Sequence, residues 1–433
     1  MKFSQVTALL EELECQKKMF GNLVVLDWWD SVRNGNATTA ENAGCIFDVF
    51  RILCPDLDKV RKFDMQEHSL AAQMTRVFGL EGTTRGKRIQ EWKGRAYENI
   101  EGQGDLGTTI ASVFENDESL CVDIGISYLH ELLDELSLHS KWTTQDNSRY
   151  KAGPRRSPMR ILSDLLKYRF NNAKKWIVRI ILKNLSISHK SLQIMNAFHP
   201  CFTNIYRMQT DLRMSCTIMA EMISEGFASD QVVQNKVLNK DRYCQAMTKF
   251  AKPKLHTFIS TTECEQAKCI AQLYLDLRNV QNEKSFYTEV KYDGERMQIH
   301  ISSAGGDITI FSKSGRNSTE DRIQSHDIIK AALGIHNKFS FFNEIKRPSH
   351  FLQAQDCILE GELVVYNHLE NGFERFGTVA DFRGSDKTYE LALKIGYFLK
   401  TVITTSYSMI SFGSTLNLKC EFHLVKGVNC SKI

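Results

Sequence analysis

The chain has 433 residues, of which 42% are hydrophobic and 24% charged, and its formal net charge is +4. This length allows two or three domains with their own cores, and this balance excludes a disordered or fibrous protein. The 12 cysteines form no Cys-x-x-Cys pair, which argues against a zinc site and indicates reduced thiols in an intracellular protein. No signal-peptide core follows Met1, and the apolar run 397–412 is too short and too polar to span a bilayer.

Residues 1–245 predict a mostly helical domain. Apolar residues recur at helical spacing in several segments, among them 129–136. The segment 173–183 has its tryptophan and isoleucines on one face and its basic residues on another. Gly102–Gly107 matches the glycine pattern of a dinucleotide-binding loop, but no buried strand precedes it. We therefore predict a tight loop there that opens the next helix.

Residues 141–190 form a basic segment, with 13 lysines and arginines against two aspartates. A one-sided excess of this length is typical of a surface that binds a polyanion, most often nucleic acid. A solvated helical face is the alternative. We predict contacts that position a nucleic-acid backbone without reading its bases, made by Arg155, Arg156, Lys174, Lys175, Arg179 and Lys183.

From about residue 284 the apolar period shortens toward two, which predicts strands. The segments 287–291, 296–301, 307–311 and 358–366 alternate in this way, and glycine-rich turns separate some of them. The two halves together predict an α+β multidomain protein, with a helical domain followed by a domain of antiparallel sheets.

The first of these strands leads into Lys291-Tyr292-Asp293-Gly294-Glu295-Arg296, which has the spacing Lys-x-Asp-Gly-x-Arg. A lysine at a strand-to-turn junction can attack phosphorus once burial or nearby positive charge lowers its pKa. An ordinary hairpin that turns at Asp293-Gly294 is the alternative. The context favours the nucleophile, because Arg296 opens the next strand and a second acidic strand follows at Glu360-Gly361-Glu362.

The segment 289–300 resembles motif I of the ATP-dependent DNA ligases, and it is most similar to ligases of the end-joining type. Residues 311–317 resemble the family's next motif. Residues 360–363 resemble its motif III, with glutamate in place of the commoner first aspartate. Upstream, the segments 104–107 and 174–185 are similar to parts of the family's DNA-binding domain.

The resemblance implies that Lys291 takes AMP from ATP, with Mg²⁺ present, and passes it to a 5′-phosphate, after which a 3′-hydroxyl displaces the AMP. In the family, Arg296 contacts the ribose, and Glu362 lies near the ribose and the metal. Val290 replaces a commoner threonine. The implied nucleotide-binding residues are Glu289, Val290, Lys291, Tyr292, Arg296, Arg316 and Glu362, and Glu362 is also the implied metal-binding residue.

The family pattern ends after the segment 376–384. No adenine-stacking aromatic, Glu-Gly strand, Lys-x-Lys strand, OB-fold or pair of BRCT domains follows. We therefore expect a chain truncated after motif III: an all-helical DNA-binding domain at 1–245, an incomplete nucleotidyltransferase (adenylation) domain at 246–393, and a divergent tail at 394–433 that is either folded or disordered. We also expect impaired activity, and no binding of the scaffold partner of end-joining ligases, because the BRCT region is missing.

Three functions stay open. The first is an end-joining DNA ligase that acts on nicked or broken duplex DNA in the nucleus, the compartment that the resemblance implies. The second is an RNA ligase or mRNA capping enzyme, which shares the Lys-x-Asp-Gly centre. The long basic helical domain ahead of Lys291 argues against it, because capping enzymes begin close to the motif. The third is a non-catalytic DNA-binding fragment, which nick sealing on duplex DNA would exclude.

Overall fold

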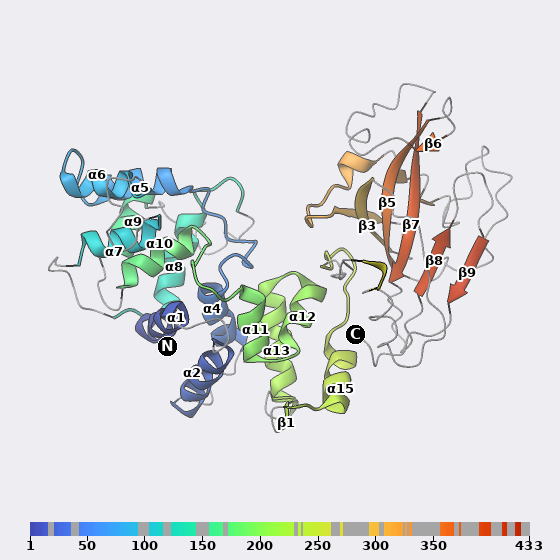
Figure 1. Ribbon diagram of the computed structural model, residues 1–433, viewed down its shortest axis with the longest axis horizontal. Helices are drawn as coiled ribbons and strands as arrows, with labels where there is room; N and C mark the ends of the chain where they lie inside the picture. Colours follow the sequence, from blue (N-terminus) through green and yellow to red (C-terminus); the bar gives the residue numbers. More distant parts are fainter. Residues whose placement is uncertain are drawn as a thin grey trace. The chain divides into compact units, whose positions relative to one another are not determined.

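The computed structural model divides the chain into two compact units, Met1–Ala251 and Lys252–Ile433 (Figure 1). The division follows helix α15 (Lys240–Phe250), whereas the boundary predicted at residue 245 falls inside that helix. No helix in the described part of the chain is long and apolar enough to cross a membrane. The structure describes residues 1–15, 21–35, 43–93, 104–115, 123–143, 156–167, 172–228, 233–234, 237–260, 269–271, 294–302, 307–323, 325–326, 329–330, 356–367, 372–373, 389–399, 409–413 and 421–425.

The first unit is built of helices, as its apolar spacing predicts. One short antiparallel pair, β1 (Val233–Gln234) and β2 (Val237–Leu238), precedes α15. The other helices are α1 (Phe3–Cys15), α2 (Gly21–Gly35), α4 (Ala43–Leu53), α5 (Glu67–Val77), α6 (Thr84–Gln90), α7 (Leu106–Val113), α8 (Ile126–Ser137), α9 (Pro158–Leu166), α10 (Ala173–Ile181), α11 (Ser191–Phe198), α12 (Phe202–Gln209) and α13 (Leu212–Ser224).

Side-chain caps fix where several of these helices begin. The carboxylate of Asp105 accepts a hydrogen bond from the backbone N–H of Thr108 at 2.8 Å, and Gly104 before it has a φ of +85°. The glycine-rich stretch therefore opens α7, as predicted, because only glycine adopts such a φ without strain. Ser157 caps α9 in the same way, with Pro158 at its first position.

Aromatic side chains join the helices of the first unit into one core. The ring of Phe198 packs edge-on against those of Trp29 and Phe50, with ring centroids 4.6 and 5.3 Å apart. Phe202 packs edge-on against Phe50 at 4.8 Å. These contacts link α2, α4, α11 and α12, and edge-to-face aromatic pairs add to the stability that burial alone provides.

A five-stranded antiparallel sheet forms much of the described part of the second unit, which confirms the α+β class in its coarse form. Its strand order is β4-β3-β5-β6, and β7 also pairs with β5. The strands are β3 (Glu295–Ile301), β4 (Ile308–Ser312), β5 (Cys357–Asn367), β6 (Gly372–Phe373) and β7 (Tyr389–Leu399), with a 3-10 turn at Glu320–Arg322. In the region expected as a divergent tail, β8 (Met409–Gly413) pairs with β9 (Glu421–Val425).

The register between β3 and β5 brings two distant motifs together. Arg296 lies opposite Glu362, and Gln298 lies opposite Glu360. Successive side chains of a strand point to opposite faces, so these four residues share one face of the sheet. Met297 and Ile299 point the other way and are fully buried. A slip of one residue would bring these apolar side chains to the polar face of Arg296 and Glu360, so their burial fixes the register.

Candidate nucleotidyl-transfer site and basic surface

Most of motif I lies outside the described residues. Glu289, Val290, Lys291 and Tyr292 are among those that the structure leaves undescribed. The described chain resumes at Gly294, which is buried and leads directly into β3. The position of the predicted nucleophile therefore stays a prediction, while the structure places the residues that follow it.

Arg296 forms an ion pair with Glu360 on the neighbouring strand. The two are diagonal neighbours, because Glu362 and not Glu360 lies directly opposite Arg296. The second carboxylate oxygen of Glu360 accepts a hydrogen bond from Nε2 of Gln298 at 2.9 Å. The side chains of Arg296 and Glu360 are 30% and 18% exposed, so the pair is partly shielded from water and its attraction is stronger than that of a surface pair.

Glu362 is half-buried beside this pair. In the part of the chain that the structure describes, no group of three or more His, Cys, Asp and Glu side chains could hold a metal ion by itself. Mg²⁺ is commonly held by one or two carboxylates together with the phosphates of a nucleotide. A single carboxylate at Glu362, on the same face as Arg296, fits that mode of binding.

A second ion pair lies at the start of β3. Glu295, the residue after Gly294, pairs with Arg322, and Arg322 Nε donates to Oγ of Ser318 at 3.3 Å. The side chain of Arg322 is 12% exposed. The pair therefore anchors the end of motif I to the segment that follows β4.

Arg316, predicted to contact the nucleotide, lies at the turn after β4. Its side chain is 71% exposed and pairs with Asp321 at 2.6 Å. The turn needs glycine at position 315, where φ is +79° and a Cβ atom would come within 2.7 Å of the Phe258 ring. The structure thus gives Arg316 a partner on its own loop, Asp321, and no hydrogen bond between Arg316 and Glu362 is present among the described residues.

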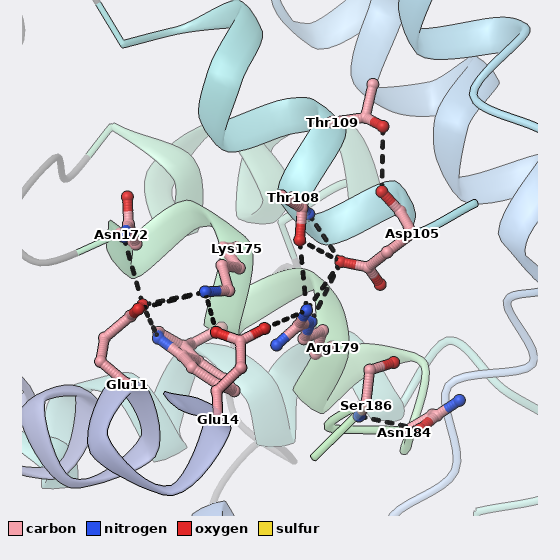
Figure 2. A network of polar contacts seen from close by, with 11 residues as sticks. Glu11, Glu14, Asp105, Thr108, Thr109, Asn172, Lys175, Arg179, Asn184 and Ser186 are labelled. Carbon is pink, nitrogen blue, oxygen red and sulfur yellow. Dashed lines mark hydrogen bonds and ion pairs between the residues drawn. The ribbon is translucent and has the colours of Figure 1, made fainter. Parts of the chain in front are cut away.

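The basic residues of α10 do not form the exposed face that their spacing suggests, and the expectation of a solvated or DNA-facing surface is wrong for three of them. Lys174, Lys175 and Arg179 are buried, Arg179 to 3% exposure. Lys175 Nζ pairs with Glu11 at 3.1 Å and with Glu14 (Figure 2). These lysines and this arginine are internal structural charges.

Arg179 joins α10 to two other helices. Its Nη2 lies 2.8 Å from the carboxylate of Glu14 in α1 and 2.9 Å from that of Asp105 at the start of α7 (Figure 2). Burial alone would raise the pKa of Asp105, but hydrogen bonds from Thr108 and Arg179 outweigh it and hold this pKa below its ordinary value. The network gives Lys175 and Arg179 carboxylate partners inside the unit.

The other predicted nucleic-acid contacts differ in their surroundings. Arg155 lies outside the described residues. Arg156 is bound by two carboxylates, Glu135 and Asp164, although its side chain is 38% exposed. Lys183 is half-buried and donates to the backbone oxygen of Asp58. Burial lowers the pKa of Lys183 to about 8, and Arg61 and Lys62 nearby act in the same direction.

Lys183 belongs to a surface that sequence reasoning missed. We call this surface the Lys62 patch. The hydroxyl of Thr143 donates to the backbone oxygen of Val60 at 2.9 Å and so joins two exposed loops. The side chain of Trp142 is 57% exposed, and Nζ of Lys141 lies 4.7 Å from the centre of its ring. Lys62 is exposed, and its positive charge helps to lower the pKa of both Lys59 and Lys183. The patch comprises Lys59, Val60, Lys62, Lys141, Trp142 and Lys183.

A buried ionic cluster lies beside this patch. Asp134 of α8 accepts from Arg51 and Arg61, with N–O distances of 2.6 Å in both pairs, and Asp58 accepts from Arg51 at 2.8 Å. His130 donates through Nε2 to the backbone oxygen of Asp48, so its Nδ1 accepts from Arg61 at 3.0 Å. Burial, reinforced by the two arginines, holds the pKa of His130 well below its ordinary value. The cluster fixes the loop that carries Lys59 and Lys62.

Comparisons with known proteins agree with both halves of this description. Residues 2–199 match the family model described as "DNA ligase N terminus", and residues 266–404 match that of the "ATP dependent DNA ligase domain". The chain is 24% identical over 344 residues to DNA ligase 4 of Dictyostelium discoideum, covering 77% of this chain and 28% of that protein. It is 23% and 22% identical to the DNA ligases 4 of Arabidopsis thaliana and Aspergillus fumigatus, with 77% of this chain covered in each case and 23% and 31% of those proteins. The chain thus spans under a third of the length of these relatives.

Proposed function

Because the chain belongs to the family of ATP-dependent DNA ligases, we propose that it seals nicked or broken duplex DNA through a lysyl-AMP intermediate, as an end-joining ligase. The observation that carries the proposal is the register of β3 and β5, which gathers Arg296, Glu360 and Glu362 on one face directly after the Lys-x-Asp-Gly motif. A hairpin with no catalytic role would not require this gathering of charge.

The reaction proceeds in three displacements at phosphorus. The neutral amine of Lys291 attacks the α-phosphorus of ATP, a P–N bond forms, and the bond to pyrophosphate breaks. An oxygen of the 5′-phosphate at the break then attacks the same phosphorus and releases the lysine, leaving AMP on the DNA end. The 3′-hydroxyl finally attacks the DNA phosphate, the phosphodiester forms, and AMP leaves.

The residues on β3 and β5 bind and orient the nucleotide in this proposal. Arg296 presents N–H donors to the ribose while Glu360 holds its guanidinium in place. Glu362 provides a carboxylate for Mg²⁺, which when bound neutralises charge on the transferring phosphate. Glu289, Val290 and Tyr292 line the nucleotide, and Arg316 meets it from the turn after β4.

Among the described residues of the first unit, the Lys62 patch is the surface that best fits DNA. Its lysines supply the positive charge that a phosphate backbone requires, and Trp142 offers an exposed aromatic ring on which a base can stack. Arg156 and Lys183 remain in the proposed interface, while Lys174, Lys175 and Arg179 support it from inside the unit. Because breaks in chromosomal DNA are the proposed substrate, we infer that the protein acts in the nucleus.

Transfer of AMP to the chain tests the proposal. Purified protein is incubated with α-labelled ATP and Mg²⁺, and then with a nicked duplex. We expect label on the wild-type chain, none on Lys291→Ala, and its release when the nick is sealed. Label that forms without any sealing would assign adenylation alone to this chain. The absence of label on the wild type would leave only DNA binding, which a shift assay with the same duplex measures.

A further inference from the structure

Gln298 is buried in β3, two residues after Arg296 and on the same face, and its side chain has no place in the reaction described so far. It is 3% exposed. Its Oε1 accepts from the backbone N–H of Ile259 at 2.8 Å, and its Nε2 donates to the backbone oxygen of Ile259 at 3.1 Å. Nε2 also donates to Glu360 at 2.9 Å. One carboxamide thus links the segment before motif I to the carboxylate that holds Arg296.

The neighbouring histidine fixes the orientation of this carboxamide. His300 Nδ1 accepts from the backbone N–H of His256 at 3.2 Å, so in the neutral ring the proton is on Nε2. Burial lowers the pKa of His300 to about 4, which keeps the ring neutral at physiological pH. Nε2 then donates to Oε1 of Gln298 at 3.0 Å. Both donors and both acceptor lone pairs of Gln298 are used, so the side chain has one arrangement.

We propose that Gln298 is a positioning residue for adenylation: it sets the carboxylate of Glu360, and through it the guanidinium of Arg296, while fastening the segment Lys252–Ser260 to the sheet. The proposal rests on the proposed ligase function. Glu360 uses one oxygen for Arg296 and the other for Gln298. Without the hydrogen bond from Gln298 the carboxylate is held by Arg296 alone, so the donors that Arg296 turns toward the nucleotide are less firmly oriented.

The chemistry of the site explains why glutamine is required there. Glutamate would have no donor for Glu360 or for the oxygen of Ile259, and it would bring a second negative charge beside Glu360. Asparagine is one methylene shorter and cannot reach Ile259 and Glu360 together. A buried backbone group left without a partner is costly, so each substitution disturbs both ends of the link.

Self-adenylation kinetics test the proposal. We expect Gln298→Glu to lower kcat/KM for ATP by about tenfold or more, because it removes a hydrogen bond to a charged group. Because Gln298 and Glu360 act through one link, the double variant Gln298→Glu with Glu360→Gln should lose less than the product of the two single losses. The matched control is Thr309→Val, which breaks the 2.7 Å hydrogen bond between Thr309 and His256 without touching Gln298. This control should keep the wild-type kcat/KM.

Each outcome has one meaning. Wild-type kinetics in Gln298→Glu would overturn the positioning role alone, and so would losses that multiply in the double variant or that Thr309→Val reproduces. If Gln298→Glu does not fold, Gln298→Asn replaces it with the same expectation. A wild-type chain that takes no label from ATP overturns the proposed function and this role together.

Discussion

Arg296 and Glu360 lie diagonally across strands β3 and β5, and the guanidinium of the first donates to the carboxylate of the second. The pair joins motif I to motif III, which are more than sixty residues apart along the chain. It also shows why a glutamate at position 360 serves in place of aspartate, since its longer side chain reaches both Arg296 and Gln298.

The length of Glu360 can therefore be tested directly. Glu360→Asp keeps the charge but shortens the side chain by one methylene, so it can satisfy Arg296 or Gln298 but not both. We expect kcat/KM for ATP in self-adenylation to fall by about tenfold, the equivalent of one charged hydrogen bond. Glu360→Gln should cost at least as much, because it also removes the charge. Equal rates in wild type and Glu360→Asp would show that the double hydrogen bonding has no role.

Arg179 is expected to act on stability and not on DNA affinity. Arg179→Ala leaves the carboxylates of Glu14 and Asp105 without their shared partner inside the unit. Breaking a buried pair in this way costs about 3 kcal/mol. Urea unfolding followed by tryptophan fluorescence measures the loss, because all five tryptophans lie in the first unit. The exposed pair Arg76–Glu81 supplies the control, since Arg76→Ala should cost less than about 1 kcal/mol.

The Lys62 patch should carry the salt-dependent part of DNA binding. Lys62→Ala should reduce the slope of log K against log salt by about 0.9 for each phosphate that the lysine no longer neutralises. Trp142→Ala should weaken binding to a duplex with an unpaired end by about 1–3 kcal/mol and change the salt slope little. Lys249→Ala serves as the control, because that exposed lysine lies outside the patch and pairs with Glu225. A salt slope that changes in Lys249→Ala but not in Lys62→Ala would contradict the assignment of DNA binding to the Lys62 patch.

The buried His130 makes the first unit sensitive to acid. Its pKa in the folded chain lies well below the ordinary value of about 6.5, so below that pH the unfolded chain binds a proton that the folded chain excludes. The contribution of His130 to the free energy of unfolding is therefore fully present above about pH 6.5 and is lost as the pH falls. His130→Gln keeps a donor for Asp48 and an acceptor for Arg61 but does not titrate.

We expect the advantage of wild type over His130→Gln in free energy of unfolding to shrink by about 1 kcal/mol between pH 7.5 and 5.5. Taking the difference removes the contributions of Asp48, Asp58 and Asp134, which both proteins share. Tryptophan fluorescence in urea at the two pH values gives the measurement. An advantage that stays constant with pH would mean that His130 titrates normally in the folded chain.

Local patterns predicted much of the fold. Alternation in the segments 296–301 and 307–311 predicted β3 and β4 to within a residue, because one face of each strand is apolar. The glycine-rich loop was correctly predicted to open a helix, since the side chain of Asp105 caps the helix by accepting from the backbone N–H of Thr108. These features depend only on neighbours along the chain.

The charges of α10 could not be read from the sequence in the same way. Whether a lysine faces water or a carboxylate depends on Glu11, Glu14 and Asp105, which lie far away along the chain. The face that Gln298 shares with Arg296 was readable from the sequence, because the two residues stand two positions apart in one strand. Its bond to Ile259 again required the tertiary fold.

Peptide mapping by mass spectrometry after incubation with ATP and Mg²⁺ shows whether Lys291 receives AMP. We predict one adenylated peptide, the one that contains Lys291. Its adduct should be lost at acid pH, where phosphoramide bonds hydrolyse, and should be absent from Lys291→Ala. Adenylation at another lysine, or an unmodified Lys291 peptide in a chain that nevertheless seals nicks, would contradict the account.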